Sequence, residues 1–373
     1  MKIIWFSEIK WSYLRTRKQH ILSNFDASDE ILFIEPISFN LKNKFNISIE
    51  KNIKYITVPQ LQNSDIKILN YLIHFYPIKK LVEITSIFLM NRLLKKISFK
   101  ADIIIVSNVF WIEYLNKIKN KYNLKIIYDC NDNPLAFSNA INKTSYFNKT
   151  LRFSDNIVIP YKSYKNFIPQ KYHNKINIIS NGVDENLISS KHNELSILKD
   201  IKNIIMYIGS IDTRLDYQLI DYLANELKDF NFIFVGDVKK QIKSKFNILL
   251  KNHNNIIHFK SIKYNEIGNY LSYANLAIIP FLKTALSEFI LPNKVFEYSI
   301  SEKPFIISNF NKSLKDFNSE FLIAKNKEQF KQLILEQIQN PYDGNSLKQF
   351  ALDYSWIKIS QQYHKLIKSI IKK

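Results

Sequence analysis

The sequence has little cysteine and no long apolar segment. Its 373 residues include one cysteine, Cys130, which excludes an intramolecular disulfide framework and fits a reducing compartment. The most apolar region, residues 66–97, is interrupted by charged residues and by Pro77, so it falls short of the roughly 18–20 apolar residues of a spanning helix. The apolar run at residues 2–6 is too brief for a signal peptide. We therefore expect a cytoplasmic protein, soluble or peripheral on the inner face of the membrane.

Metal-binding patterns are also missing. The seven histidines are scattered along the chain, and the sequence contains no Asp-x-Asp triplet. Clusters of His, Cys, Asp or Glu at short spacing are the usual mark of a metal centre. We therefore expect neither a metal nor a bound cofactor.

Acidic residues are outnumbered by basic ones. The 53 lysines and arginines exceed the 33 aspartates and glutamates, which gives a formal net charge of +20. Such a surplus favours anionic partners: phosphates, an acidic membrane leaflet or nucleic acid. Because the basic residues are spread along the chain rather than gathered with aromatic residues, nucleic acid is disfavoured. Phosphate or membrane contact is our interpretation, and ordinary solvation of the surface is the alternative.

Short apolar runs alternate with longer amphipathic stretches, as in parallel strands that are buried on both faces and joined by helices. At roughly 150–200 residues for each domain, the pattern predicts an α/β fold of two doubly wound, Rossmann-like domains facing a central cleft. We place these domains at residues 1–170 and 171–350, followed by a last helix at 351–373. The first series of expected strands is 2–6, 31–35, 53–58, 102–106, 125–128 and 156–160. The second series is 176–179, 204–208, 231–235, 256–259, 276–280 and 304–307.

Glycine is scarce, with five in the chain, so its positions are informative. Gly182, Gly209 and Gly236 each follow an expected strand of the second series. Glycine is required where φ is positive or where backbones approach closely, and ligands bind at the carboxyl ends of strands in open α/β sheets. We expect these loops to border a ligand site, with plain turn glycines as the alternative.

Residues 287–298 combine a helix start with charged side chains. Pro292 suits the first turn of a helix, and such a helix start directs N–H groups and a positive dipole end at an anion. Lys294 adds a point charge suited to a diphosphate, and Glu297, one turn later, suits two ribose hydroxyl groups. Helix capping and solvated charge are the alternative explanation.

At this segment the sequence resembles the GT-B glycosyltransferases of family 4. Pro292-Asn293-Lys294-Val295-Phe296-Glu297-Tyr298, followed by Glu302-Lys303-Pro304, is similar to the P-x-K-x-x-E-Y…G-K-P variant of bacterial polysaccharide enzymes. Glu302 replaces the usual glycine. The stretches around Asn181-Gly182-Val183-Asp184, Gly209, Gly236 and Asp353-Tyr354-Ser355-Trp356 follow the family order. The resemblance covers the second half almost continuously and the first half loosely. It implies that the last helix, residues 351–373, crosses back to the first domain.

The resemblance implies a retaining, metal-independent, hexosyltransferase-type reaction. The donor would be a UDP- or GDP-type nucleotide diphosphate-sugar, and the acceptor a surface polysaccharide or a lipid-linked glycan. Glu297 would hold the ribose, Lys294 and the helix start the diphosphate, and Glu288 would lie near the sugar, while backbone near residues 260–264 would contact the base. We add Arg214 because a guanidinium stabilises the charge that grows on the leaving diphosphate. The expected donor-binding residues are Gly209, Gly236, Arg214, Pro292, Asn293, Lys294 and Glu297, and the expected catalytic residues are Glu288, Asp132, Arg214 and Lys294.

The expected acceptor residues lie in the first half. Asp132 follows the expected strand 125–128, so its carboxylate is placed to position an acceptor hydroxyl or to take its proton, although stabilisation of the turn explains it equally well. The looser match adds Trp11 and Arg17 as acceptor-binding residues. Residues 66–100 mix apolar side chains at helical spacing with lysines and arginine. They predict either docking on an anionic leaflet or a helix packed on the sheet.

Two further functions fit the same architecture. A non-hydrolysing sugar-nucleotide epimerase would convert the donor without an acceptor. A catalytically inactive partner of a polysaccharide assembly complex would bind no nucleotide. A nucleic-acid-binding module would require salt-sensitive retention on a duplex.

Overall fold

The computed structural model describes residues 1–12, 15–37, 42–60, 75–137, 143–187, 195–284, 287–311, 314–318 and 321–372. The chain divides into two compact units: Met1–Ser180 together with Ile357–Lys373, and Asn181–Trp356. The first unit therefore takes its last part from the end of the chain. The boundary follows residue 180, later than the boundary after residue 170 that we expected.

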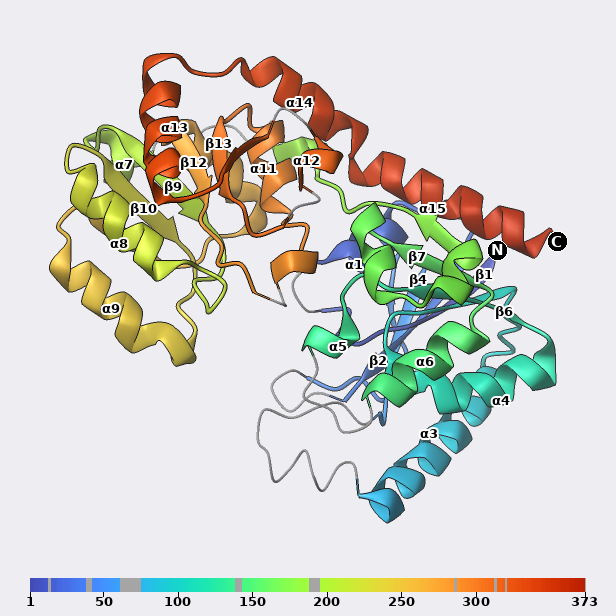
Figure 1. Cartoon of the computed structure of the whole chain (residues 1–373). Helices are drawn as coiled ribbons and strands as arrows, with labels where there is room; N and C mark the ends of the chain where they lie inside the picture. Colours follow the sequence, from blue (N-terminus) through green and yellow to red (C-terminus); the bar gives the residue numbers. More distant parts are fainter. Residues whose placement is uncertain are drawn as a thin grey trace. The chain divides into compact units, whose positions relative to one another are not determined.

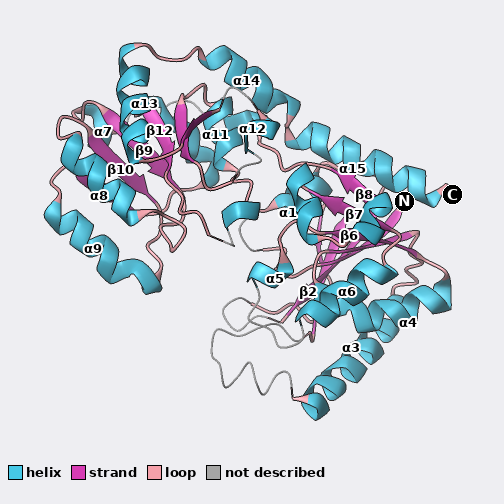
Figure 2. Ribbon diagram, in the orientation of Figure 1, coloured by secondary structure: helices cyan, strands magenta, loops and turns pink. Residues whose placement is uncertain are grey.

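The first unit is built on an eight-stranded sheet (Figures 1 and 2). All neighbouring strands are parallel except the antiparallel edge pair β3 and β4. The central strands are continuous apolar runs because they are buried on both faces. The strand order is β3 (Ser48–Glu50), β4 (Ile53–Val58), β2 (Glu30–Pro36), β1 (Lys2–Phe6), β5 (Ile103–Val106), β6 (Lys125–Asp129), β7 (Asn156–Ile159) and β8 (Ile176–Ile178).

Helices and short 3-10 turns cover this sheet. The longest helix of the group is α3, and none of the helices in the described ranges is both long and apolar enough to cross a membrane. The helices are α1 (Arg17–Ser23), α3 (Tyr76–Lys96), α4 (Ile112–Tyr122), α5 (Pro134–Phe137), α6 (Lys143–Phe153) and α15 (Trp356–Ile371).

The second unit holds an all-parallel sheet of six strands. The strand order reverses between β9 and β12, so the carboxyl ends of these two strands form the position at which open α/β sheets bind ligands. The order is β11 (Ile256–Phe259), β10 (Asn231–Val235), β9 (Ile204–Ile208), β12 (Leu276–Ile279), β13 (Phe305–Ser308) and β14 (Leu322–Ala324). The helices are α7 (Ser196–Lys199), α8 (Tyr217–Glu226), α9 (Lys243–Asn252), α10 (Ile267–Tyr273), α11 (Lys294–Ile300), α12 (Leu314–Phe317), α13 (Lys327–Gln339) and α14 (Gly344–Asp353).

One expected strand belongs to the other sheet. Ile176–Ile178 pairs with β7 in the register Ile157↔Ile176, so it closes the first sheet instead of opening the second. Its assignment to the second series was therefore wrong, and Gly182 follows a strand of the first sheet. The short strands β3 and β14 were not predicted.

The last helix crosses back to the first unit, as predicted. It begins at Trp356, whose N–H donates to the carbonyl oxygen of Val183 at 2.9 Å. The Ser360 hydroxyl then donates to the carbonyl oxygen of Ile21 at 2.6 Å, and the buried Tyr363 ring lies 5.7 Å from Trp5. These contacts make α15 part of the first hydrophobic core.

Candidate functional site

Two glycines at the carboxyl ends of β9 and β10 adopt backbone conformations that other residues rarely adopt. Gly209 has φ +143° and Gly236 has φ +153°. A Cβ on Gly236 would lie only 2.0 Å from the carbonyl oxygen of Gly209, so the two loops touch. Both positions therefore require glycine, and they form a tight pair of loops at this edge of the second sheet.

Lys294, the first residue of α11, extends to the loop after β9. A Cβ on Gly209 would lie 2.1 Å from the Lys294 Nζ and 2.7 Å from its Cε. The same ammonium is 5.1 Å from the centre of the Tyr207 ring, within cation–π range. The missing side chain at Gly209 thus makes room for a cation beside exposed backbone.

Glu297 and Arg214 belong to the same electrostatic cluster. Burial lowers the pKa of Lys294. The Glu297 carboxylate raises this pKa in part, and the Arg214 guanidinium lowers it further. Burial raises the pKa of Glu297, and Lys294 opposes this shift. Glu297, from α11, and Arg214, from the β9 loop, are therefore both close enough to Lys294 to influence its ionisation.

Arg214 is held in place by Asp212. Its Nε lies 2.9 Å from Asp212 Oδ1 and its Nη2 lies 2.6 Å from Oδ2, while the guanidinium stands 5.4 Å from the centre of the Phe281 ring. Burial by itself raises the pKa of Asp212, but the hydrogen bonds from Arg214 outweigh it and lower this pKa. A two-point contact fixes the plane of a guanidinium. Asp212 was not among the predicted site residues, although an acid two positions before a candidate phosphate ligand is a signal for such a contact.

The start of α11 differs from the expectation. The helix begins at Lys294 after an N-cap at Asn293, not at Pro292, and is seven residues long. The N–H groups of residues 295, 296 and 297 already donate to the carbonyl oxygens of Pro292 and Asn293 at 2.9–3.1 Å. Anion binding by the helix start stays a prediction, and these three N–H groups already have acceptors within the protein. The positive charge at this position comes from Lys294 and Arg214.

Glu288 lies in a tight turn between β12 and α11. Thr284 and the buried Ser287 hold this turn reciprocally, since the N–H of each donates to the hydroxyl of the other at 2.8 and 3.0 Å. The Glu288 N–H donates to the carbonyl oxygen of Thr284 at 3.0 Å, and its side chain is half-buried. Its contact with the transferred sugar stays a prediction.

Tyr264 is a site residue whose side chain the sequence analysis did not select. It opens the 3-10 turn Tyr264–Glu266 after β11. Burial raises the pKa of its phenol, and the Glu297 carboxylate raises it further, which places the two side chains near each other. Only backbone contacts were expected in this stretch.

A second polar cluster lies at the carboxyl ends of β1, β5 and β6 in the first unit. The Glu8 carboxylate accepts hydrogen bonds from Lys18 and from the Ser107 hydroxyl, the latter at 2.6 Å. Part of the Asp132 side chain reaches solvent, but desolvation by the surrounding protein and the nearby Glu8 carboxylate raise its pKa, while Lys18 lowers it. Asp132 therefore lies beside the Glu8–Lys18 pair, which the sequence analysis missed.

Trp11 and Arg17 have structural partners instead of open surfaces. Trp11 is 5% exposed, packs on Phe33, and donates its indole N–H to Glu50 at 2.9 Å. Arg17 is 3% exposed and contacts Asp129 at 3.3 Å and the carbonyl oxygens of residues 179 and 180. Both side chains are buried in the first unit, and their contact with an acceptor stays a prediction.

Comparison with known proteins gives two curated relatives and many similar folds. No protein-family profile matches the chain. It is 26% identical to Bacillus subtilis TuaH, a proposed teichuronic acid biosynthesis glycosyltransferase, over 38% of this chain and 36% of TuaH. It is 24% identical to an uncharacterized glycosyltransferase of Methanocaldococcus jannaschii over 65% of this chain and 67% of the relative. The match to TuaH thus spans little more than a third of that protein.

Solved structures match the whole chain at low identity. Sucrose-phosphate synthase from Thermosynechococcus elongatus superposes with a TM-score of 0.74 at 11% identity, covering 100% of this chain and 99% of that chain. Anabaena HepE, solved with UDP and glucose, superposes at 0.69 and 13% identity over 99% and 100% of the two chains. The lipopolysaccharide galactosyltransferase WaaB reaches 0.65 at 14% identity, with 99% of each chain covered. The chain has the GT-B fold.

One departure from the expected GT-B motif now has a physical explanation. Glu302, which replaces the usual glycine, has φ +55°, in the left-handed region that ends helices. Its N–H and that of Lys303 donate to the carbonyl oxygens of Ser299 and Tyr298, each at 3.0 Å, and its carboxylate pairs with Lys348 of α14. The turn after α11 in this GT-B chain therefore keeps the conformation of a glycine cap, with an ion pair added.

Proposed function

We propose that the chain is a metal-independent, retaining glycosyltransferase that uses a UDP- or GDP-type sugar donor. The observation that carries the proposal is the position of the Lys294 ammonium, which lies against Gly209 in the space that any other side chain would fill. A cation beside exposed backbone at the carboxyl end of a central strand suits a diphosphate. The glycosyltransferase relatives support the same activity.

The electrostatic cluster assigns a part of the donor to each residue. Lys294 and Arg214 provide two positive charges for the two phosphates, and Glu297 accepts hydrogen bonds from the ribose. Tyr264 adjoins Glu297 and is placed for the base side of the ribose. Charge grows on the diphosphate as the sugar leaves, and preorganised cations stabilise that transition state more than the bound donor. The two cations thus carry out the stabilisation for which other enzymes use a metal.

The acceptor side of the proposal rests on Asp132. Asp132 is exposed at the carboxyl end of β6, and desolvation and the Glu8 carboxylate raise its pKa, which makes it a stronger base for the proton of an acceptor hydroxyl. The acceptor is a growing surface glycan or a lipid-linked sugar, a proposal supported by the likeness to TuaH, named for teichuronic acid biosynthesis, and to the lipopolysaccharide galactosyltransferase WaaB. We assign the reaction to the cytoplasm, at the inner face of the membrane.

The outer face of α3, defined by Leu81, Ile84 and Phe88, supports membrane attachment. These side chains are 65%, 53% and 61% exposed, and they occupy one side of the helix at the spacing i, i+3, i+7. Exposed basic residues follow at the C-terminal end of the same helix: Arg92, Lys95 and Lys96. Exposed apolar side chains next to basic residues suit contact with an anionic leaflet, which attracts basic segments. The variant Phe88→Glu should reduce co-sedimentation with anionic vesicles and leave nucleotide binding unchanged.

A thermal-shift panel of UDP, GDP, CDP and ADP tests the donor site. A nucleotide at 100 times its Kd adds about 2.7 kcal/mol to the free energy of unfolding, or about 5–10 °C in Tm for domains of this size. Lys294→Ala and Glu297→Ala should lose the shift, whereas Lys251→Ala, an exposed lysine of α9, should keep it. If Lys294→Ala and Glu297→Ala both show the same nucleotide-induced rise in Tm as the parent, the proposed donor site is wrong.

Product analysis separates the alternatives. A transferase releases nucleotide diphosphate and forms glycan only when an acceptor is present. An epimerised donor formed without any acceptor would instead establish an epimerase, and the absence of any nucleotide shift would favour an inactive partner.

A further inference from the structure

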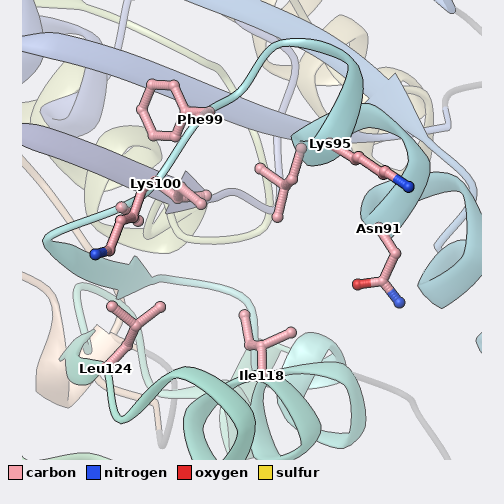
Figure 3. Close-up of a pocket in the computed structure, with 9 residues that line it drawn as sticks. Asn91, Lys95, Phe99, Lys100, Ile118 and Leu124 are labelled. Atoms are coloured by element: carbon pink, nitrogen blue, oxygen red, sulfur yellow. The ribbon is translucent and has the colours of Figure 1, made fainter.

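A cavity of about 430 Å³ lies on the first unit (Figure 3). Two of its lining residues, Lys100 and Ala101, lie just before β5, separated from it by Asp102, and Leu124 precedes β6. The cavity therefore lies at the amino ends of strands whose carboxyl ends carry the polar cluster, roughly 15 Å along a strand of four or five residues. It is separate from both proposed substrate sites. Its lining residues are Ile4, Asn91, Leu94, Lys95, Phe99, Lys100, Ala101, Ile118 and Leu124.

The walls of this cavity are apolar. Ile4, Phe99, Ala101 and Ile118 are otherwise buried core residues, and Ile118 and Leu124 point towards the segment that carries Phe99 and Lys100 (Figure 3). Protein interiors are normally packed to crystal density, so an opening of this size among core side chains is unusual. Water gains few hydrogen bonds in an apolar cavity. An apolar chain is therefore the chemistry that fits the interior.

The rim of the cavity is cationic. Lys95 and Lys100 are exposed, and in Figure 3 their ammonium groups lie at opposite ends of the apolar side chains. The lining contains no carboxylate. Asp102, the acid next to Ala101 in sequence, accepts the N–H of Lys2 at 2.7 Å. Lysines place their stems on apolar surface and their charge in water, so the rim suits a negative headgroup.

The cavity adjoins the outer face of α3. Asn91, Leu94 and Lys95 come from the last turns of α3, where Arg92 and Lys96 are also exposed. A bilayer bound by Leu81, Ile84 and Phe88 would therefore present its anionic headgroups beside the opening. The positive charge of the rim and the position of the opening beside α3 both favour an anionic lipid as the occupant.

We propose that this cavity takes up an acyl chain of an anionic phospholipid, with the positive charges of Lys95 and Lys100 on its rim attracting the anionic headgroup. The site is a lipid anchor at the edge of the first sheet opposite the acceptor residues. It would hold the enzyme on an anionic leaflet independently of donor and acceptor.

Calorimetric titration of the whole chain with dioctanoylphosphatidylglycerol, below its critical micelle concentration, tests the proposal. We expect saturable binding that weakens by at least about tenfold when both Lys95→Glu and Lys100→Glu are introduced, since each basic residue near an anionic headgroup contributes appreciably. Ala101→Phe, which fills the cavity, should abolish binding. A matched double variant, Lys117→Glu with Lys251→Glu, changes the net charge equally at exposed positions outside the lining and should bind like the parent.

Three results would overturn the proposal. Equal affinity for dioctanoylphosphatidylcholine would show that the lysines do not select charge. Equally tight binding of glycerol phosphate would identify a phosphate site without a lipid chain. Parental affinity in folded Ala101→Phe, or in Leu124→Trp should the first variant not fold, would place the lipid elsewhere. Phe88→Glu should still bind the monomeric lipid but should no longer bind vesicles. The nucleotide thermal shift should equal that of the parent in every variant. Failure of the lipid proposal is therefore distinguishable from failure of the donor site.

Discussion

Replacing Gly209 with alanine tests whether Lys294 and the β9 loop form one binding surface. At φ +143° an alanine stores about 1–3 kcal/mol of backbone strain. Its methyl group would also lie 2.1 Å from the Lys294 Nζ, so the ammonium must move away. Because the ammonium ends a flexible side chain, this movement adds little to the cost of folding. We expect Tm to fall by about 2–12 °C, at about 2–4 °C for each kcal/mol.

Gly209→Ala should weaken nucleotide binding more than its loss of folding stability would explain. A hydrogen bond to a charged group contributes about 1.5–3 kcal/mol, so displacing the ammonium should raise the Kd for the preferred nucleoside diphosphate by about 10- to 150-fold. Calorimetric titration well below the melting temperature measures this change on folded protein. The fold-change in Kd then reports the Lys294 contact separately from the loop strain.

Gly236→Ala is the matched control for strain. Its φ is similar, but its new methyl group would lie 2.0 Å from the backbone oxygen of Gly209, which cannot rotate away. Its loss of stability should therefore exceed that of Gly209→Ala. If folded Gly209→Ala protein binds the nucleotide like the parent, Lys294 does not contact the phosphates and the reasoning fails.

Three other predictions follow from contacts already described. The pKa of Glu297 is raised and that of Lys294 is lowered, so donor affinity should fall at both ends of the pH range. The acid loss follows protonation of the Glu297 carboxylate, and the alkaline loss follows deprotonation of the Lys294 ammonium. In a calorimetric pH series, Lys294→Gln should show no alkaline loss. Glu302→Gly should be more stable to urea than Glu302→Ala by about 1 kcal/mol, since only glycine relieves the left-handed strain; equal midpoints would contradict this. Arg17→Ala should cost about 3–5 kcal/mol by leaving the buried Asp129 carboxylate unpaired, and adding Asp129→Asn should restore part of that loss in denaturant titrations.

The interior strands could be predicted from the sequence because parallel strands buried on both faces are continuous apolar runs. Ile204–Ile208 and Asn231–Val235 occur where the pattern placed them. Ile176–Ile178 has the same composition but is an edge strand, with Ile178 48% exposed. Composition identified it as a strand and could not identify its sheet, because that depends on pairing with β7. Strands of three residues, such as β3, are too short to show a period.

The site could be predicted in part. Lys294 and Glu297 belong to one local motif, so their proximity was readable from spacing. Trp11 and Arg17 suit a ligand and a protein interior equally well, and their partners, Glu50 and Asp129, are distant in sequence. The Glu8–Lys18 pair was missed for a related reason: its third member, Ser107, comes from the end of another strand.

The crossing of α15 has a consequence for the order of folding. Ile359, Tyr363 and Ile367 are almost completely buried in the unit that Met1 begins, so the ribosome makes these parts of that core last. Domains tend to fold as they emerge, yet here the N-terminal unit stays incomplete while all of the second unit is synthesised. Chains truncated after Trp356 and freed from the ribosome should therefore carry a protease-resistant second unit and a first unit that is still open to cleavage.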